Sequence, residues 1–200
     1  MNIMTEINFT IGKDNIERDF PRIASEIMNQ WILKVNYAEY RIAEIEFYLH
    51  SDFHEDSYSH RHVLQREKGR WYLHGSGLDI TFGSDKMYAS ILLRAIYNLK
   101  NGDYIYGPLN SLAEIFNSFS GIYKTHQTIG LIPAKNSQFV YEKPICAPRV
   151  GLNQVKDPIM FDKHYRYLIM PKRKHAEKTK IAEALRKQGC TEDEIRNIWG

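Results

Sequence analysis

The stretch Tyr40-Arg41-Ile42-Ala43-Glu44-Ile45-Glu46-Phe47-Tyr48-Leu49 decides how this chain folds, because its alternation predicts a long β-strand. Successive side chains of a strand point to opposite faces of a sheet. One predicted face is wholly apolar and must lie against the core: it carries Ala43, Ile45, Phe47 and Leu49. The opposite face carries Ile42, Glu44, Glu46 and Tyr48. The strand therefore places two carboxylates and a phenol in one row.

Two interpretations of this row are open. Side chains two residues apart on a strand lie ~7 Å from each other, and two carboxylates with a phenol are suited to general acid–base catalysis. The alternative is a solvent-facing surface of the sheet with no chemistry. The sequence of this strand does not decide between them.

Arg94 interrupts a second apolar run, residues 89–99, that otherwise predicts a buried strand. A buried guanidinium without a partner costs several kcal/mol, so we expect a carboxylate on a neighbouring strand. Glu46 or Glu44 would serve. The pair is either a structural ion pair or part of a catalytic site.

The remaining pattern predicts a mostly antiparallel α+β domain over residues 1–170. We expect one helix over residues 21–33, with Asp19 as its cap, and another from Gly107-Pro108 to about Ser118. Further strands are expected over residues 70–74 and 78–82, and near 139–141 and 165–169. Gly75-Ser76-Gly77 predicts a turn or bulge, and Asp79 follows it on a polar strand face.

A basic tail, residues 171–200, follows this domain. It holds eight Lys/Arg and five Asp/Glu, so it accounts for the whole net charge of +3. We expect a helix over residues 175–188 that Gly189 stops, then a short helix opened by a Thr191–Glu194 capping box. The tail is either a solvated surface or a nucleic-acid contact, with phosphates bound by Lys172, Arg173 and Lys174.

Five of the eight histidines lie within residues 50–74: His50, His54, His60, His62 and His74. A metal site is one interpretation, but the spacing matches no specific metal motif. The other interpretation is that most of these histidines are solvated loop residues and that one or two of them belong to a site. We therefore predict no metal and no cofactor.

Composition bounds the class of protein. The chain has 200 residues, of which 43% are hydrophobic, so it is long enough for one domain with its own core. No apolar run is long enough to span a membrane, and no signal peptide is expected. Its two cysteines, Cys146 and Cys190, are far apart in the sequence, which favours free thiols and a cytoplasmic location.

Five short motifs follow one another over residues 20–170 in a familiar order. The strand quoted above is similar to R-I-V-E-T-E-A-Y-L, and Asp56-Ser57-Tyr58-Ser59-His60 is similar to an acidic loop that ends in His. Leu92-Leu93-Arg94-Ala95 matches L-L-R-A, and Gly107-Pro108 matches a Gly-Pro helix start. Pro148-Arg149-Val150-Gly151, followed by Tyr165-Arg166-Tyr167-Leu168, matches P-R-V-G and W-R-F-Y. In this order of motifs the chain resembles the alkyladenine (3-methyladenine) DNA glycosylase family.

The resemblance implies a 3-methyladenine DNA glycosylase-like (formyltransferase C-terminal-like) domain around a curved sheet. It implies a DNA partner and removal of a damaged, alkylated or deaminated purine by base flipping, as in base excision repair. Glu46 falls on the base that activates water, and Arg94 on the residue that helps to hold that water. Tyr48 and His60 fall on residues that contact the flipped base.

The sequence departs from the family at three places: a basic T-P-R-N-R loop has no clear counterpart in residues 62–68, and two single positions differ. The family's tyrosine wedge is replaced by Ser76, and its pocket asparagine, near Gly83, is missing. His74 and Asp79 are candidate replacements in the pocket, and Glu44 is a further candidate for substrate contact. The alternatives are a non-catalytic relative that binds nucleic acid, and a hydrolase that acts on RNA or a nucleoside.

Overall fold

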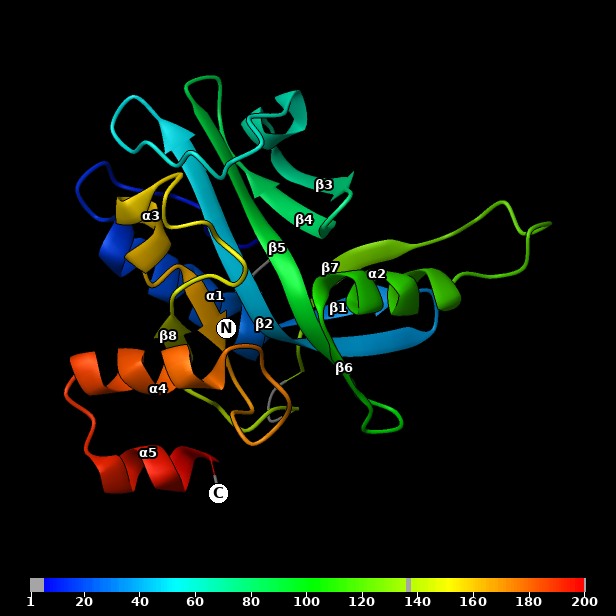
Figure 1. Cartoon of the computed structure of the whole chain (residues 1–200). Helices are drawn as coiled ribbons and strands as arrows, with labels where there is room; N and C mark the ends of the chain where they lie inside the picture. The colour runs from blue at the N-terminus through cyan, green and yellow to red at the C-terminus, as the bar shows by residue number, and fades with distance from the viewer. Residues whose placement is uncertain (1–5, 136–137, 200) are drawn as a thin grey trace.

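Two long antiparallel strands, β2 (Ala38–Ser51) and β5 (Met87–Asn98), form the centre of the sheet in the computed structural model, which describes residues 6–135 and 138–199. The main path of the sheet runs β3-β4-β5-β2-β1-β7 and curls (Figure 1). It uses β1 (Trp31–Val35), β3 (Lys68–His74), β4 (Gly77–Phe82) and β7 (Ile129–Pro133). Short strands β6 (Tyr104–Tyr106), β8 (Ile145–Ala147) and β9 (Arg166–Leu168) complete it, with β6 on β5 and β9 on β2. The expected mixed α+β architecture with an antiparallel sheet is confirmed.

Helix α1 (Ile16–Gln30) covers the apolar face of β2. Ala43, Ile45, Phe47 and Leu49 are all fully buried there, as predicted. The ring of Phe20 stacks on that of Phe47, with centroids 4.2 Å apart. This layer of side chains is the main core, and it fixes the orientation of β2.

The opposite face of β2 is buried too, so the solvent-facing interpretation of that row is wrong. Glu44 and Glu46 are both 0% exposed: β9 pairs with β2 at these residues, His175 beyond β9 contacts Glu44, and the Val150 backbone before β9 contacts Glu46. The register against β5 shifts between Ile42 and Ile45, which marks a bulge at this point. The polar row therefore lies inside the protein.

The first helix was predicted too late in the sequence. It begins at Ile16 and ends at Gln30, whereas Trp31 to Leu33 belong to β1. Asp19 lies inside the helix and accepts a hydrogen bond from the Gly12 backbone N–H at 2.8 Å, so it is no cap. Trp31 continues the four-residue spacing of Ile23 and Ile27, which hides the boundary between helix and strand.

Most of the other predicted strands and the second predicted helix are confirmed. Strands β3, β4, β5 and β9 and helix α2 (Pro108–Asn117) lie where the pattern places them. The strand predicted near residues 139–141 is wrong, because that segment is irregular and β8 begins at Ile145. The pattern missed β1, β6 and β7, and also two short helices, η1 (Val63–Arg66) and α3 (Pro158–Asp162).

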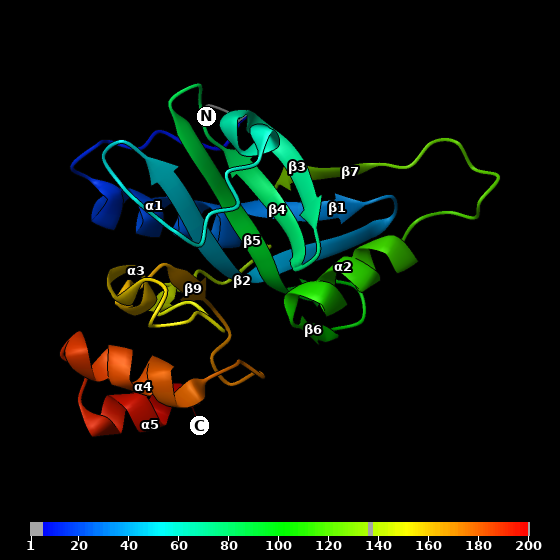
Figure 2. The same ribbon diagram turned by 45° about the horizontal axis from the view of Figure 1, so that its top comes forward.

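The tail forms two helices, α4 (Lys178–Lys187) and α5 (Glu192–Trp199), which lie next to each other at one end of the molecule (Figures 1 and 2). The first of them begins at Lys178 and not at His175, and Gly189, with φ at 90°, follows its end as predicted. The capping box is confirmed, since the Thr191 N–H donates to Glu194 at 2.7 Å and the Glu194 N–H donates to the Thr191 hydroxyl. Buried Ile181 and Leu185 pack with Leu168 of β9, so the tail adheres to the sheet. None of the described helices is long and apolar enough to cross a membrane.

Candidate functional site

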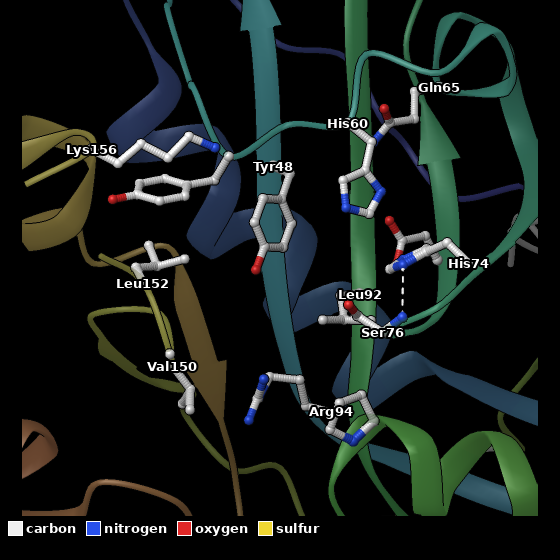
Figure 3. Close-up of a pocket in the computed structure, with 14 residues that line it drawn as sticks. Tyr48, His60, Gln65, His74, Ser76, Leu92, Arg94, Val150, Leu152 and Lys156 are labelled. Atoms are coloured by element: carbon white, nitrogen blue, oxygen red, sulfur yellow. Dashed lines mark hydrogen bonds and ion pairs between the residues drawn. The ribbon is translucent and has the colours of Figure 1, made fainter. Parts of the chain in front are cut away.

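A cavity of about 300 Å³ opens over the polar face of β2 and β5 (Figure 3). Its other walls are the β3–β4 hairpin, the segment that leads into η1, and the loop over residues 150–156. Four ring side chains line it: Tyr48, Tyr58, His60 and His74. Three charged side chains do so too: Asp79, Arg94 and Lys156. Such a cavity matches the lower end of the usual size range for small-ligand sites.

The structure gathers most of the predicted site residues around this cavity. Tyr48, His60, His74, Asp79 and Arg94 all line it. Glu46 lies directly behind them, fully buried. The structure does not bring Glu44 or the segment 172–174 to the cavity wall.

Glu46 is held from three sides. Its Oε1 accepts a hydrogen bond from the Val150 backbone N–H at 2.7 Å and lies 3.3 Å from Arg94 Nε. Its Oε2 accepts one from the Tyr48 hydroxyl at 2.9 Å. A carboxylate oxygen can accept two hydrogen bonds, and Oε2 has a single partner among the described residues. Oε2 thus has one hydrogen-bonding position without a partner among these residues, in a side chain that is 0% exposed.

Glu44 has a different environment. Its Oε1 accepts hydrogen bonds from Arg94 Nε and Arg166 Nε, both at 2.9 Å, and its Oε2 lies 2.6 Å from His175 Nδ1. Burial alone would raise the pKa of this carboxyl, but the His175 hydrogen bond and the two arginine charges outweigh it and hold the pKa at about 2. Glu44 is thus the centre of a buried charge cluster behind the cavity.

Arg94 joins the two carboxylates. Burial would lower its pKa, but the charges of Glu46 and Glu44 raise it well above the ordinary arginine value. The prediction that Arg94 has a carboxylate partner is therefore confirmed, and Arg94 contacts both Glu44 and Glu46. The guanidinium is cationic under any ordinary condition, and it lines the cavity.

Tyr48 is fixed by a second buried ion pair. Arg149 donates to the two carboxylate oxygens of Asp56 at 2.6 and 3.1 Å, and both residues are 0% exposed. The Arg149 guanidinium also lies 4.5 Å from the centre of the Tyr48 ring, a cation–π distance. Burial and the charge of Glu46 raise the pKa of the Tyr48 phenol, so its proton stays on the hydroxyl that faces Glu46.

His60 stands at the end of the loop that Asp56 anchors. Its Nδ1 lies 3.2 Å from the Tyr72 hydroxyl, and its ring meets that of His74 edge to face at 4.6 Å. Burial lowers the pKa of His60, and the neighbouring His74 lowers it further. The Nε2 of His60 makes no hydrogen bond to another described residue, so a neutral ring can use it for a ligand.

His74 is locked in one tautomer. Its Nδ1 accepts the Ser76 backbone N–H at 3.2 Å, so the ring proton resides on Nε2 and is donated to Asp79 at 2.9 Å. The second oxygen of Asp79 accepts the Ser90 hydroxyl at 2.6 Å, and Ser90 in turn accepts from Gln65 at 2.8 Å. This chain of hydrogen bonds fixes one wall of the cavity, and both ring nitrogens of His74 are used.

The tip of the β3–β4 hairpin forms the rim of the cavity. Ser76 lies there with a short side chain, and the neighbouring Gly77 sits tightly against Leu92 and Pro108, each 3.0 Å from where a Cβ would lie. At the far end of β4, a Cβ on Gly83 would overlap the carbonyl oxygens of Gln65 and Met87. Glycine at this position is therefore a requirement of close backbone packing.

The histidine-rich segment divides into two groups. His60, His62 and His74 gather around Tyr72, whereas His54 packs against Tyr165. Over residues 6–135 and 138–199, no group of three or more His, Cys, Asp or Glu side chains is placed to hold a metal ion.

The basic segment 172–174 is exposed and lies outside the cavity. The Lys174 ammonium is 5.1 Å from the centre of the Tyr106 ring, and the Arg173 guanidinium is 5.9 Å from that of Tyr97. Tyr106 pairs with Ala95, the residue after Arg94. The segment thus flanks the Arg94 end of the cavity, and Lys156 lines the cavity from the 150–156 loop.

Sequence reasoning missed several residues that build the site, among them Arg149, Val150 and His175. Arg149 and Val150 belong to a motif quoted for the family resemblance, but no role was predicted for them. Val150 acts through its backbone N–H, which leaves no signal in side-chain chemistry. His175 is a single histidine in a basic tail, and nothing near it in the sequence points to Glu44.

Comparison with known proteins adds a relative but no activity. No model of a known protein family matches the chain. A protein of Acanthamoeba polyphaga mimivirus is 29% identical over 218 residues, and the match covers 92% of this chain and 99% of the viral one. That protein is described only as uncharacterised. The chain is therefore similar to a viral protein over nearly the whole length of both.

Proposed function

We propose that this protein is an N-glycosidic hydrolase that releases a damaged purine base from DNA, with a fold of the 3-methyladenine DNA glycosylase type. One observation carries the proposal: a buried Glu46–Arg94 pair lies beneath a cavity walled by Tyr48, His60 and His74. Carboxylate, guanidinium and aromatic walls are the groups that removal of a base by water requires.

In this proposal a water molecule binds between Glu46 Oε2 and the terminal nitrogens of Arg94. Glu46 takes a proton as the water oxygen attacks C1′, while the bond between C1′ and the base nitrogen breaks. The sugar develops oxocarbenium character, which the nearby carboxylate stabilises. The Tyr48 ring packs against the base, and His60 Nε2 bonds to its edge. The bond that forms is C1′–O, and the base leaves with the electrons of the N-glycosidic bond.

The DNA would reach the cavity with the target base turned out of the stack. Lys156 and the segment 172–174 stand on two sides of the cavity and supply cations for phosphates. Ser76 at the rim is too short to fill the gap that a flipped base leaves in a duplex. We therefore expect damaged bases in single strands or mispaired sites to be the better substrates, and base excision repair to be the process served.

A second function has an observation in its favour. Glu46 is 0% exposed, and both of its oxygens already accept hydrogen bonds. A fully buried carboxylate with both oxygens hydrogen-bonded inside the protein is also typical of a purely structural ion pair. The alternative is a relative that binds nucleic acid without catalysis, or one that hydrolyses RNA or a nucleoside.

A single-turnover base-release assay tests the proposal. The substrates are duplexes and single strands that carry hypoxanthine, ethenoadenine or a methylated purine, with RNA and free nucleosides as further arms. Glu46→Gln should lower the rate by about 100-fold or more, whereas Glu39→Gln, which changes an exposed glutamate on the same strand, should not. Release that persists in Glu46→Gln would overturn the role of Glu46. Binding without release by the wild type, measured by fluorescence anisotropy, would favour the non-catalytic alternative.

A further inference from the structure

His175 stands in an unusual place for a residue of the basic tail. It is buried beside Glu44, although 131 positions separate the two in the sequence. Its Nδ1 lies 2.6 Å from Glu44 Oε2, and its Nε2 lies 3.1 Å from the Met170 carbonyl oxygen. The tail therefore supplies a side chain to the charge cluster behind the cavity.

The partners of His175 fix the role of its Nδ1. This nitrogen faces a carboxylate oxygen, which can only accept a hydrogen bond, so Nδ1 carries an N–H that it donates to Glu44. Around the rest of the ring lie the Met170 carbonyl oxygen, 3.1 Å from Nε2, and the Tyr104 hydroxyl, 3.4 Å from Nδ1 and 3.5 Å from Nε2. His74 is the contrast within this protein, because a backbone N–H points at its Nδ1.

His175 also determines how Glu44 is held. It is the single hydrogen-bond partner of Glu44 Oε2 among the described residues, whereas Oε1 is shared by Arg94 and Arg166. A buried carboxylate oxygen without a donor is costly, so loss of His175 would turn the carboxylate toward the arginines. Arg94 Nε lies between the two glutamates, 2.9 Å from Glu44 and 3.3 Å from Glu46. A turn of Glu44 would therefore move Arg94 relative to Glu46.

We propose that His175 is a positioning residue: it holds Glu44, which holds Arg94 against Glu46 at the cavity floor, so that the C-terminal segment completes the site. Its consequence for catalysis rests on the function proposed above, but the positioning itself does not. Other contacts keep the tail in place without His175. Arg166 donates to the Ala176 carbonyl at 3.0 Å, and Ile181 and Leu185 are buried against the sheet.

The experiment uses the full chain labelled with ¹⁵N and the variants His175→Ala and His175→Gln, with His126→Ala in an exposed loop as control. Wild-type long-range ¹H–¹⁵N spectra should show a proton on His175 Nδ1. The Arg94 Nε–H should exchange with solvent about tenfold faster in His175→Ala, and His175→Gln, which keeps one donor, should restore part of that protection. The control should leave it unchanged.

Single-turnover base release is measured on the same proteins. We expect His175→Ala to lower the rate constant by roughly 10- to 100-fold, with DNA binding close to that of the wild type. An Arg94 Nε–H signal that exchanges equally in wild type and His175→Ala would overturn the positioning, whatever the activity. If His175→Ala does not fold, His175→Gln is compared with the wild type instead: we expect an Arg94 Nε–H exchange that is faster by less than tenfold, and exchange equal to that of the wild type would overturn the positioning. Absence of base release from every protein, with the expected change at Arg94, would refute the proposed function and leave the positioning intact.

Discussion

Replacement of Glu44 by glutamine tests the buried charge cluster most directly. The change keeps the size of the side chain but leaves Arg94, Arg166 and His175 around a neutral amide. The carboxylate accepts hydrogen bonds from all three, at 2.9, 2.9 and 2.6 Å, and is 0% exposed. Removal of one partner from a buried ion pair costs about 3–5 kcal/mol. The new amide group also places a donor against a donor, so we expect a loss of about 4 kcal/mol in the free energy of unfolding.

Urea denaturation followed by circular dichroism measures this loss. With a slope of about 2 kcal/mol per molar urea, the midpoint should fall by about 2 M, and the melting temperature by roughly 10 °C. Glu39→Gln is the matched control, because Glu39 lies on the same strand in an exposed pair with Lys34 at 3.4 Å. Such a pair contributes about 1 kcal/mol or less. A Glu44→Gln protein as stable as Glu39→Gln would refute the view that this cluster depends on its central charge.

Three further predictions concern stability. Asp56→Asn leaves Arg149 buried without its charge partner, so we expect a loss of about 3–5 kcal/mol in the free energy of unfolding. Amide hydrogen exchange in the loop over residues 57–60 should become faster, and unchanged exchange would show that the Asp56–Arg149 pair does not anchor the loop. Gly83→Ala should destabilise the protein by about 3 kcal/mol or more in the same urea assay, because the added methyl overlaps two backbone carbonyls, whereas Gly75→Ala has open space and should be tolerated. In acid, Glu44 contributes stability that is fully present above its unfolded pKa of 4.5 and lost as the pH falls toward its folded pKa of about 2. Wild-type protein should therefore lose more stability than Glu44→Gln between about pH 5 and pH 2.5, and equal losses would contradict the lowered pKa.

The central strand and its partners could be predicted because their signals are local. Strict alternation over residues 40–49 marks both faces of β2, and an arginine within an apolar strand demands a carboxylate nearby. The same pattern could not show that the polar face is buried. That burial comes from Val150, β9 and the chain after β9, all more than 100 residues away.

Other parts of the fold leave no local signal. The run Trp31-Ile32-Leu33 continues the apolar pattern of α1 into β1, so periodicity cannot place the boundary. Strands β6 and β8 have three residues each, too few to show an alternation. His175 becomes part of the site only through tertiary structure, and a lone histidine among lysines resembles any solvated residue.

The distance in sequence between Glu44 and its partners has a consequence for synthesis of the chain. Arg166 is made 122 residues after Glu44, and His175 131 residues after it. At about 5–20 residues per second, the ribosome needs roughly 7–26 s to deliver His175. During that interval the carboxylate of Glu44 lacks its partners Arg166 and His175, and burial of an unpaired charge is unfavourable, so the polar face of β2 stays in water. The charge cluster around Glu44 can therefore form only after Arg166 and His175 have been synthesised, and a nascent chain that stalls before Arg166 lacks both of these partners.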